Sequence, residues 1–117
     1  MSATIYHYEQ CSKSTGALAL LAERGIQTRI IDYRAQPPSV DELLRLRDLM
    51  SCTAIDMLRT GDKHFRDLGF SAEDRRSDSE WFALVQQHPM ILQRPIVVIG
   101  DRAIIARPAD LVLTLID

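Results

Sequence analysis

The feature that most constrains the fold is a junction near the N-terminus, where a strand pattern changes directly into a helix pattern. Residues 3–8 are apolar, aromatic and β-branched, as is typical of a strand, and an amphipathic stretch follows. Cys11 lies at the change. The first turn of a helix offers unpaired N–H groups and the positive end of the helix dipole, which stabilise a thiolate and attract anions. The junction therefore predicts a nucleophilic thiol beside an anion site.

The residues after the junction predict a βαβ unit. The first helix is expected from about Ser12 or Ser14 to Arg24, with Gly25 as its stop. Its inner face is expected to hold Ala17, Leu18, Leu21 and Ala22. Residues 27–33 alternate as a second strand, and a strand that follows a helical crossover pairs in parallel with the first.

The middle of the chain carries only helical patterns. A helix is expected from Ser39 to about residue 50, because Ser39 and Glu42 have the spacing of a capping box. Further helical pieces are expected at residues 54–58, 62–68 and 77–87, the last behind a second match, Ser77 with Glu80. These pieces predict a helical insertion at about residues 39–90.

The last third returns to strands. Residues 96–99 and 103–106 flank Gly100-Asp101, which predicts an antiparallel hairpin. Pro108 fits the first position of a final helix whose core-facing residues would be Leu111, Val112 and Leu115. The order β-α-β, helices, β-β-α indicates an α/β, thioredoxin-like mixed sheet with a helical insertion, in a single domain over residues 1–117.

Composition narrows the class of protein. The chain is 46% apolar and 26% charged, as in ordinary soluble domains, and no apolar run could span a bilayer, so a cytoplasmic protein without a membrane partner is expected. The chain has 14 basic and 16 acidic residues, a balance that argues against a nucleic-acid partner. Cys52 is expected to be a packed bystander rather than a disulfide partner of Cys11. The histidines show no ligand spacing with the cysteines, so no metal site is expected.

Six short segments carry a more specific signal. They are Tyr6-His7, Cys11-Ser12-Lys13-Ser14, Leu58-Arg59, Gln87-His88-Pro89, Arg94-Pro95-Ile96-Val97-Val98 and Arg107-Pro108. In this order and spacing they resemble the glutaredoxin-coupled ArsC family of arsenate reductases, over nearly the whole chain from Ile5 to Leu115.

The resemblance implies a thioredoxin-like fold in which a cysteine attacks arsenate, glutathione joins the adduct as co-substrate, and glutaredoxin reduces it to release arsenite, with no bound cofactor. Cys11 matches the family's nucleophile. The matches to its other functional positions are Arg59, Arg94 and Arg107 for oxyanion binding, His7 and Ser14 for favouring the thiolate, and Pro95 for a cis peptide bond. Guanidinium groups suit such a site because they hold oxyanions bidentately and keep their charge.

The chain departs from the family's pattern beside the cysteine. Tyr8-Glu9 stands where the family often has Asn-Pro, and Thr15 stands where an arginine is often found. A carboxylate at Glu9 would raise the thiol pKa if it turned inward, and as a loop residue it is expected to face water.

Other classes remain to be weighed on the same residues. A phosphatase-like arsenate reductase needs an arginine where Ala17 stands, and a dithiol oxidoreductase needs a cysteine where Ser14 stands, so both are excluded. Two alternatives stay open: a glutathione-linked thiol oxidoreductase of ArsC-like fold with another substrate, and an Spx-like regulator that binds RNA polymerase.

Overall fold

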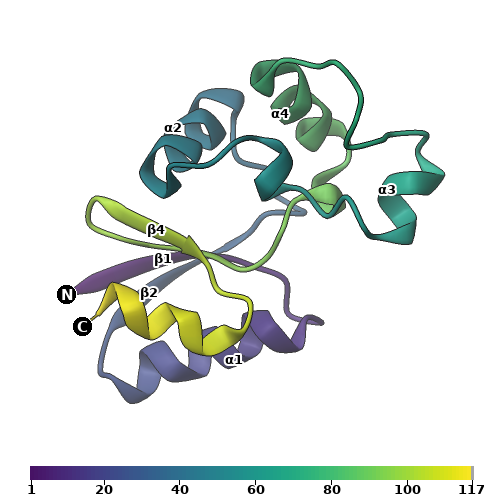
Figure 1. Cartoon of the computed structure of the whole chain (residues 1–117). Helices are drawn as coiled ribbons and strands as arrows, with labels where there is room; N and C mark the ends of the chain where they lie inside the picture. The colour runs from purple at the N-terminus through teal and green to yellow at the C-terminus, as the bar shows by residue number, and fades with distance from the viewer. Residues whose placement is uncertain (117) are drawn as a thin grey trace. The chain divides into compact units, whose positions relative to one another are not determined.

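The computed structural model describes residues 1–116, which fall into two compact units (Figure 1). The first unit contains residues 1–36 and the chain from Arg94 onward. The second is Pro37–Gln93, close to the expected insertion at residues 39–90. The description of the whole chain as a single domain stays a prediction.

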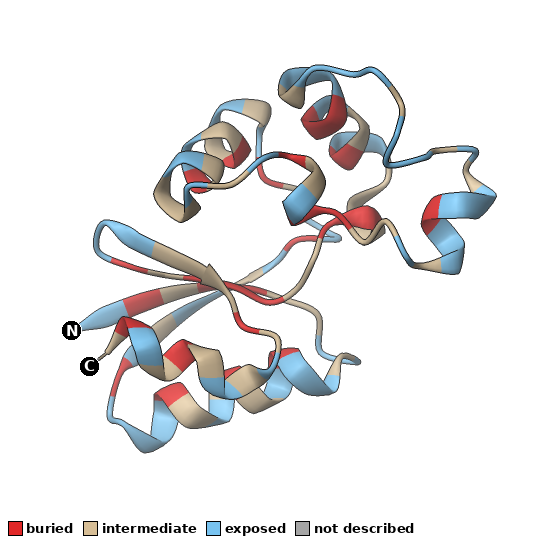
Figure 2. Ribbon diagram, viewed as in Figure 1, coloured by how far each residue is buried: buried red, intermediate tan, exposed pale blue. Residues whose placement is uncertain are grey.

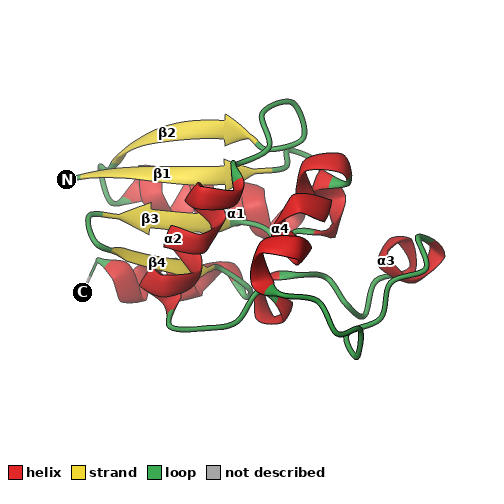
Figure 3. Ribbon diagram, turned by 90° about the horizontal axis from the view of Figure 1, so that it is seen from above, coloured by secondary structure: helices red, strands yellow, loops and turns green. Residues whose placement is uncertain are grey.

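The first unit is built on a four-stranded mixed sheet in the order β2-β1-β3-β4 (Figure 3). The strands are β1 (Ser2–His7), β2 (Gln27–Asp32), β3 (Ile96–Ile99) and β4 (Arg102–Ile105). β1 is parallel to β2 and antiparallel to β3, and β3 pairs with β4 as a hairpin. Gly100 has a φ of 62°, the positive value that a tight hairpin turn requires. The expected βαβ unit and hairpin are therefore both confirmed.

Two helices cover one face of this sheet, α1 (Ser12–Glu23) and the 3₁₀ helix η3 (Ala109–Leu115) (Figures 1 and 2). The apolar core between helices and sheet contains Ile5, Ala17, Leu21, Val97, Val112 and Leu115. The helices approach closely at Gly16, where an added Cβ would lie 3.2 Å from the Cβ of Ala109. This contact explains a glycine inside a helix, where it costs about 1 kcal/mol relative to alanine.

Four details of the expected helices were wrong. Ala22 is exposed, because α1 buries a narrow stripe through Ser14, Ala17 and Leu21. The last helix is 3₁₀ rather than α, and Pro108 precedes it as the N-cap, with a ψ of 163°, instead of forming its first residue. With that tighter winding Leu111 is half-buried, whereas Val112 and Leu115 face the core as expected.

The second unit consists of short helices. They are α2 (Val40–Met50), η1 (Ile55–Met57), α3 (Lys63–Asp67), α4 (Asp78–Gln87) and η2 (Pro89–Ile91). The Ser39 side chain accepts a hydrogen bond from the Glu42 N–H, and Ser77 with Glu80 forms a complete capping box. The ring of Trp81 stacks on Phe65, with 5.8 Å between ring centroids, and anchors a buried aromatic cluster. In the part of the chain described, no helix is long and apolar enough to cross a membrane.

Candidate active site

Cys11 is the residue immediately before the first turn of α1, with extended φ and ψ of −94° and 120°. Its N–H donates to the Tyr8 carbonyl at 3.0 Å, and its own carbonyl accepts from the Thr15 N–H at 3.0 Å. These bonds fix a tight loop between β1 and α1. The half-buried thiol is thus held where the free N–H groups of the helix can reach it.

Two arginines from the other end of the chain converge on this thiol. The Arg107 Nη1 lies 3.5 Å from the Cys11 sulfur and also donates to the Arg94 carbonyl at 3.0 Å. Arg94 precedes β3 and Arg107 follows β4, so the hairpin brings both to one end of the sheet. The Ala106 N–H donates to the Pro95 carbonyl at 2.9 Å and holds the two flanks together. The Arg94–Pro95 peptide bond is cis, the isomer expected from the sequence, and so is Arg107–Pro108.

The pKa of Cys11 is lowered from its ordinary value by these neighbours. Burial alone would raise it, because it disfavours the charged thiolate. The backbone N–H groups of Ser14 and Lys13 and the side chains of Arg94 and Arg107 outweigh burial by hydrogen bonding to the sulfur. The site therefore favours a thiolate, which is the nucleophilic form of cysteine.

Ser14 stabilises the loop as well as the sulfur. Its side chain is fully buried, and its Oγ accepts a hydrogen bond from the Tyr8 N–H at 3.1 Å. Its contribution to the low pKa of Cys11 comes through its backbone N–H. The hydroxyl thus fixes the approach of β1 to the cysteine loop.

His7 lies at the end of β1, opposite Asp32 in the parallel pairing. Burial lowers the pKa of His7, against the opposing effect of the Glu9 and Asp32 carboxylates, so the imidazole is uncharged near neutral pH. Its Nδ1 is buried without a hydrogen-bond partner among the described residues. The lowered pKa of Cys11 arises from its N–H and arginine donors, and a thiolate-favouring role for His7 stays a prediction.

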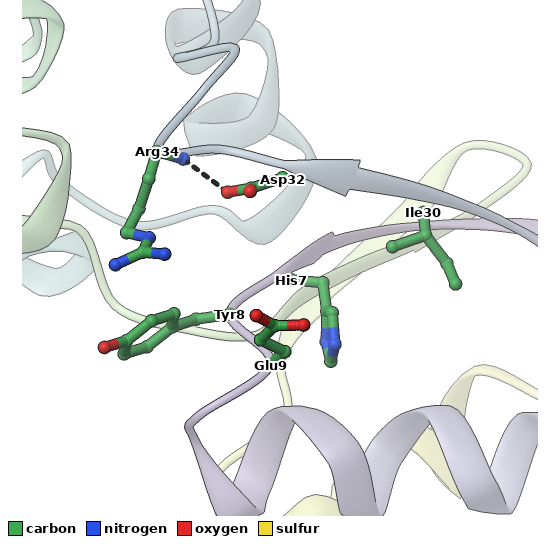
Figure 4. Close-up of a pocket in the computed structure, with 6 residues that line it drawn as sticks. All are labelled: His7, Tyr8, Glu9, Ile30, Asp32 and Arg34. Carbon is green, nitrogen blue, oxygen red and sulfur yellow. Dashed lines mark hydrogen bonds between the residues drawn. The ribbon is translucent and has the colours of Figure 1, made fainter.

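Tyr8 was not expected to belong to the site. The guanidinium groups of Arg94 and Arg34 both lie over its ring, with their Cζ atoms 4.9 and 4.6 Å from the ring centroid. Figure 4 shows Arg34 reaching over the ring from the end of β2. An aromatic residue three positions before a reactive cysteine was a usable signal for Tyr8, whereas Arg34 becomes its neighbour only through the pairing of β1 with β2. Glu9 is exposed, as expected.

Arg59 belongs to the second unit. Its backbone N–H donates to the Ile91 carbonyl at 2.7 Å, beside the isolated antiparallel β-bridge between Leu58 and Leu92. Its side chain is only 18% exposed, lies 3.7 Å from the Asp62 carboxylate, and has a buried Nε without a partner among residues 1–116. A partly buried guanidinium with spare donors suits an anion, and oxyanion binding by Arg59 stays a prediction.

Cys52 differs from Cys11 in its surroundings. Its sulfur lies 3.9 Å from the Arg47 carbonyl, and burial and the Asp56 and Asp78 carboxylates raise its pKa, against the opposing effect of the Arg47 charge. The two cysteines are free thiols with opposite pKa shifts. The described chain holds no cluster of three or more metal-ligating side chains.

Comparison with known proteins places this chain among named relatives. Residues 6–115 match the ArsC family. The chain is 38% identical to the arsenate reductase of Haemophilus influenzae, over 99% of this chain and 100% of that protein, and 35% identical to an Escherichia coli arsenate reductase, over 97% and 79%. The structure of a Vibrio cholerae arsenate reductase matches with a TM-score of 0.90 and 37% identity, over 97% of both chains. The thioredoxin-like α/β fold expected from the sequence is thereby confirmed.

Proposed function

The chain belongs to the ArsC family, and from that premise we propose that it is an arsenate reductase that takes its electrons from glutathione and glutaredoxin. Cys11 is the nucleophile, glutathione is the co-substrate that joins the adduct, and glutaredoxin reduces the adduct to release arsenite. The names of the relatives support arsenate as the substrate. The thiol reductants rest on the resemblance and on the chemistry of a single reactive cysteine.

The observation that carries this proposal is the convergence of two guanidinium groups on one thiol of lowered pKa. A thiol that only exchanges disulfides needs a thiolate and little more. A thiol that attacks an anion also needs permanent positive charge where the anion binds. Arg94 and Arg107 supply that charge at any working pH, because a guanidinium does not lose its proton.

The proposed chemistry transfers two electrons from two thiols to arsenic. The Cys11 thiolate forms a bond to As(V), and one arsenate oxygen leaves as water after taking up protons. The glutathione thiolate then bonds to the same arsenic, and a second oxygen leaves as water. A glutaredoxin thiolate attacks the glutathione sulfur, so a mixed disulfide of glutathione and glutaredoxin forms as the bond between that sulfur and arsenic breaks, and its electron pair reduces As(V) to As(III). Water then displaces arsenite from Cys11 and the free thiol is restored.

The arginines have distinct tasks in this scheme. Arg107 contacts the sulfur directly and is held by the Arg94 carbonyl, so it lies at the position where the arsenic bonds. Arg94 also lowers the pKa of the Cys11 thiol, and its guanidinium lies over the Tyr8 ring. Both would stabilise the charge on oxygens that leave arsenic, as preorganised donors do in other oxyanion sites. Arg59 is proposed as a third donor.

The decisive experiment is a coupled assay with arsenate, glutathione, glutaredoxin, glutathione reductase and NADPH. NADPH oxidation that requires both arsenate and Cys11 is the expected result. Omission of glutaredoxin should prevent the release of arsenite. Turnover of glutathione mixed disulfides without any activity on arsenate would overturn the arsenate assignment in favour of a thiol oxidoreductase with another substrate. Tight binding of RNA polymerase without turnover would overturn it in favour of a regulator.

A further inference from the structure

We propose that a cavity beside the Cys11 loop binds the γ-glutamyl end of glutathione through its α-ammonium and α-carboxylate groups. This inference rests on the proposed function, in which glutathione is the co-substrate. The cavity has a volume of about 180 Å³ and lies between the ends of β1 and β2 (Figure 4). Its lining residues are His7, Tyr8, Glu9, Ile30, Asp32 and Arg34.

The cavity carries charges of both signs. Glu9, Asp32 and Arg34 are exposed, and these three side chains form no ion pair within residues 1–116. The backbone N–H of Arg34 donates to the Asp32 Oδ1 at 3.0 Å and fixes that carboxylate at the rim of the cavity. The Arg34 guanidinium is held over the Tyr8 ring. Opposite charges are thus held apart at fixed places on one wall, which suits a ligand that bears both.

The γ-glutamyl group of glutathione is such a ligand. Its ammonium and carboxylate groups are attached to one carbon, so the ammonium can contact Glu9 or Asp32 while the carboxylate contacts Arg34. Charge-assisted hydrogen bonds of this kind are stronger than neutral ones. Ile30, which is 52% exposed, offers an apolar surface for the methylene groups.

Two other ligand classes fit the cavity less well. A doubly charged oxyanion would meet two carboxylates and only one guanidinium, so the cavity is distinct from the proposed arsenate site. A resident metal ion is disfavoured because the described residues contain no group of three or more side chains that could hold one. A small zwitterion fits both the charges and the volume.

The cavity lies within reach of the reactive sulfur. Glu9 precedes Cys11 by two peptide units, which separates their Cα atoms by at most about 7.6 Å. The Tyr8 carbonyl accepts a hydrogen bond from the Cys11 N–H, so the lining residues Tyr8 and Glu9 and the thiol of Cys11 belong to one turn. An extended tripeptide spans on the order of 10 Å. Glutathione anchored by its γ-glutamyl end can therefore present its own sulfur at Cys11.

The test compares glutathione with cysteinylglycine, the same thiol without its γ-glutamyl group. Single-turnover arsenite formation is measured at subsaturating thiol, with saturating glutaredoxin present, in wild type and in Arg34→Gln and Asp32→Asn. Each variant should lose roughly 5- to 10-fold in rate with glutathione, the effect of one partly screened charge-assisted bond. The rate with cysteinylglycine should be unchanged. Arg29→Gln is the matched control, an exposed arginine of β2 outside the cavity lining, and should behave as wild type with both thiols.

Equal losses with both thiols, or no loss with glutathione, would overturn the subsite. A second measurement does not depend on turnover: NMR titration with unreactive S-methylglutathione. The amide signals of Tyr8, Glu9 and Arg34 should shift in wild type, and the affinity should fall in Arg34→Gln. Shifts confined to other residues, or equal affinity in both proteins, would also overturn it. If neither thiol supports arsenite formation in wild type, the proposed function fails, and the NMR titration alone decides whether the cavity binds the γ-glutamyl group.

Discussion

The Arg107 guanidinium lies 3.5 Å from the Cys11 sulfur, although 96 positions separate the two residues along the chain. The contact joins the flank of the C-terminal hairpin to the loop that starts α1. It places a permanent cation against a thiolate and makes the two parts of the site depend on each other.

Replacement of the cysteines should separate their roles. Cys11→Ser is expected to abolish arsenate reduction, because a serine hydroxyl is not ionised near neutral pH and cannot attack the arsenic. Cys52→Ser should retain most activity, since the pKa of Cys52 is raised and its thiol is the less reactive. The coupled NADPH assay measures both, with circular dichroism as a check of folding. Equal loss in both variants would point to a mechanism that uses two enzyme cysteines.

The low pKa of Cys11 predicts how the reaction depends on pH. Because the folded protein favours the thiolate, alkylation of Cys11 should have a midpoint below the ~8.5 of a free cysteine. The rate should fall as the pH drops through that midpoint, where the thiolate takes up a proton. Iodoacetamide labelling in the Cys52→Ser background isolates the signal. A midpoint at or above the free value would mean that burial outweighs the N–H and arginine donors.

The arginines should matter for arsenate more than for disulfides. Arg94→Ala or Arg107→Ala removes a charge-assisted bond of about 1.5 to 3 kcal/mol, roughly 10- to 150-fold in kcat/KM for arsenate. Lysine should rescue only part, since it lacks the planar fork. Turnover of a glutathione mixed disulfide, measured beside arsenate, should fall much less, and Arg29→Ala should change neither. Parallel losses in the two activities would remove the argument for an oxyanion site.

Tyr8 should act by positioning Arg94. Tyr8→Leu removes a cation–π contact of about 0.5 to 1 kcal/mol, so the pKa of Cys11 should rise and kcat/KM for arsenate should fall several-fold. Tyr8→Phe keeps the ring and loses only the hydroxyl that donates to Gln10, so it should resemble wild type. The alkylation profile distinguishes this role from a loss of packing, which would leave the pKa of Cys11 unchanged.

The stability of the second unit should depend on the cap of α4. Ser77→Ala removes the hydrogen bond that the Glu80 N–H donates to the Ser77 Oγ and should cost about 1 kcal/mol of unfolding free energy. Urea denaturation measures the loss. Ser79→Ala, at an exposed position in the same helical turn, is the matched control and should change the free energy little.

The elements that the sequence predicted well are those with a strong local pattern. The β1–α1 junction and the hairpin at Gly100 follow from periodicity and turn chemistry. The last helix was harder, because seven residues wind as α or 3₁₀ according to packing, and its close approach to α1 at Gly16 is a tertiary contact. Ala22 was misplaced because the buried stripe of α1 is narrower than its apolar pattern.

The site divides in the same way. Cys11 was predictable from its position, and Arg94 and Arg107 from the motifs beside their prolines. The stack of Arg34 and Arg94 on Tyr8 depends on the pairing of β1 with β2 and on the path of the chain after Asp32, which no local pattern encodes. The uncharged state of His7 depends on burial, which a sequence motif does not report.

The β3–β4 hairpin also limits how this chain can be altered. Arg94 and Arg107 lie on its two flanks, and the paired residues of β3 and β4 between them fix their spacing. A residue added at the exposed Gly100-Asp101 turn leaves that pairing unchanged, so length variation and inserted tags should be tolerated there. A single residue deleted within either strand would shift the register and turn its side chains to the opposite face. The hairpin therefore tolerates changes of length at its tip and resists them along its strands.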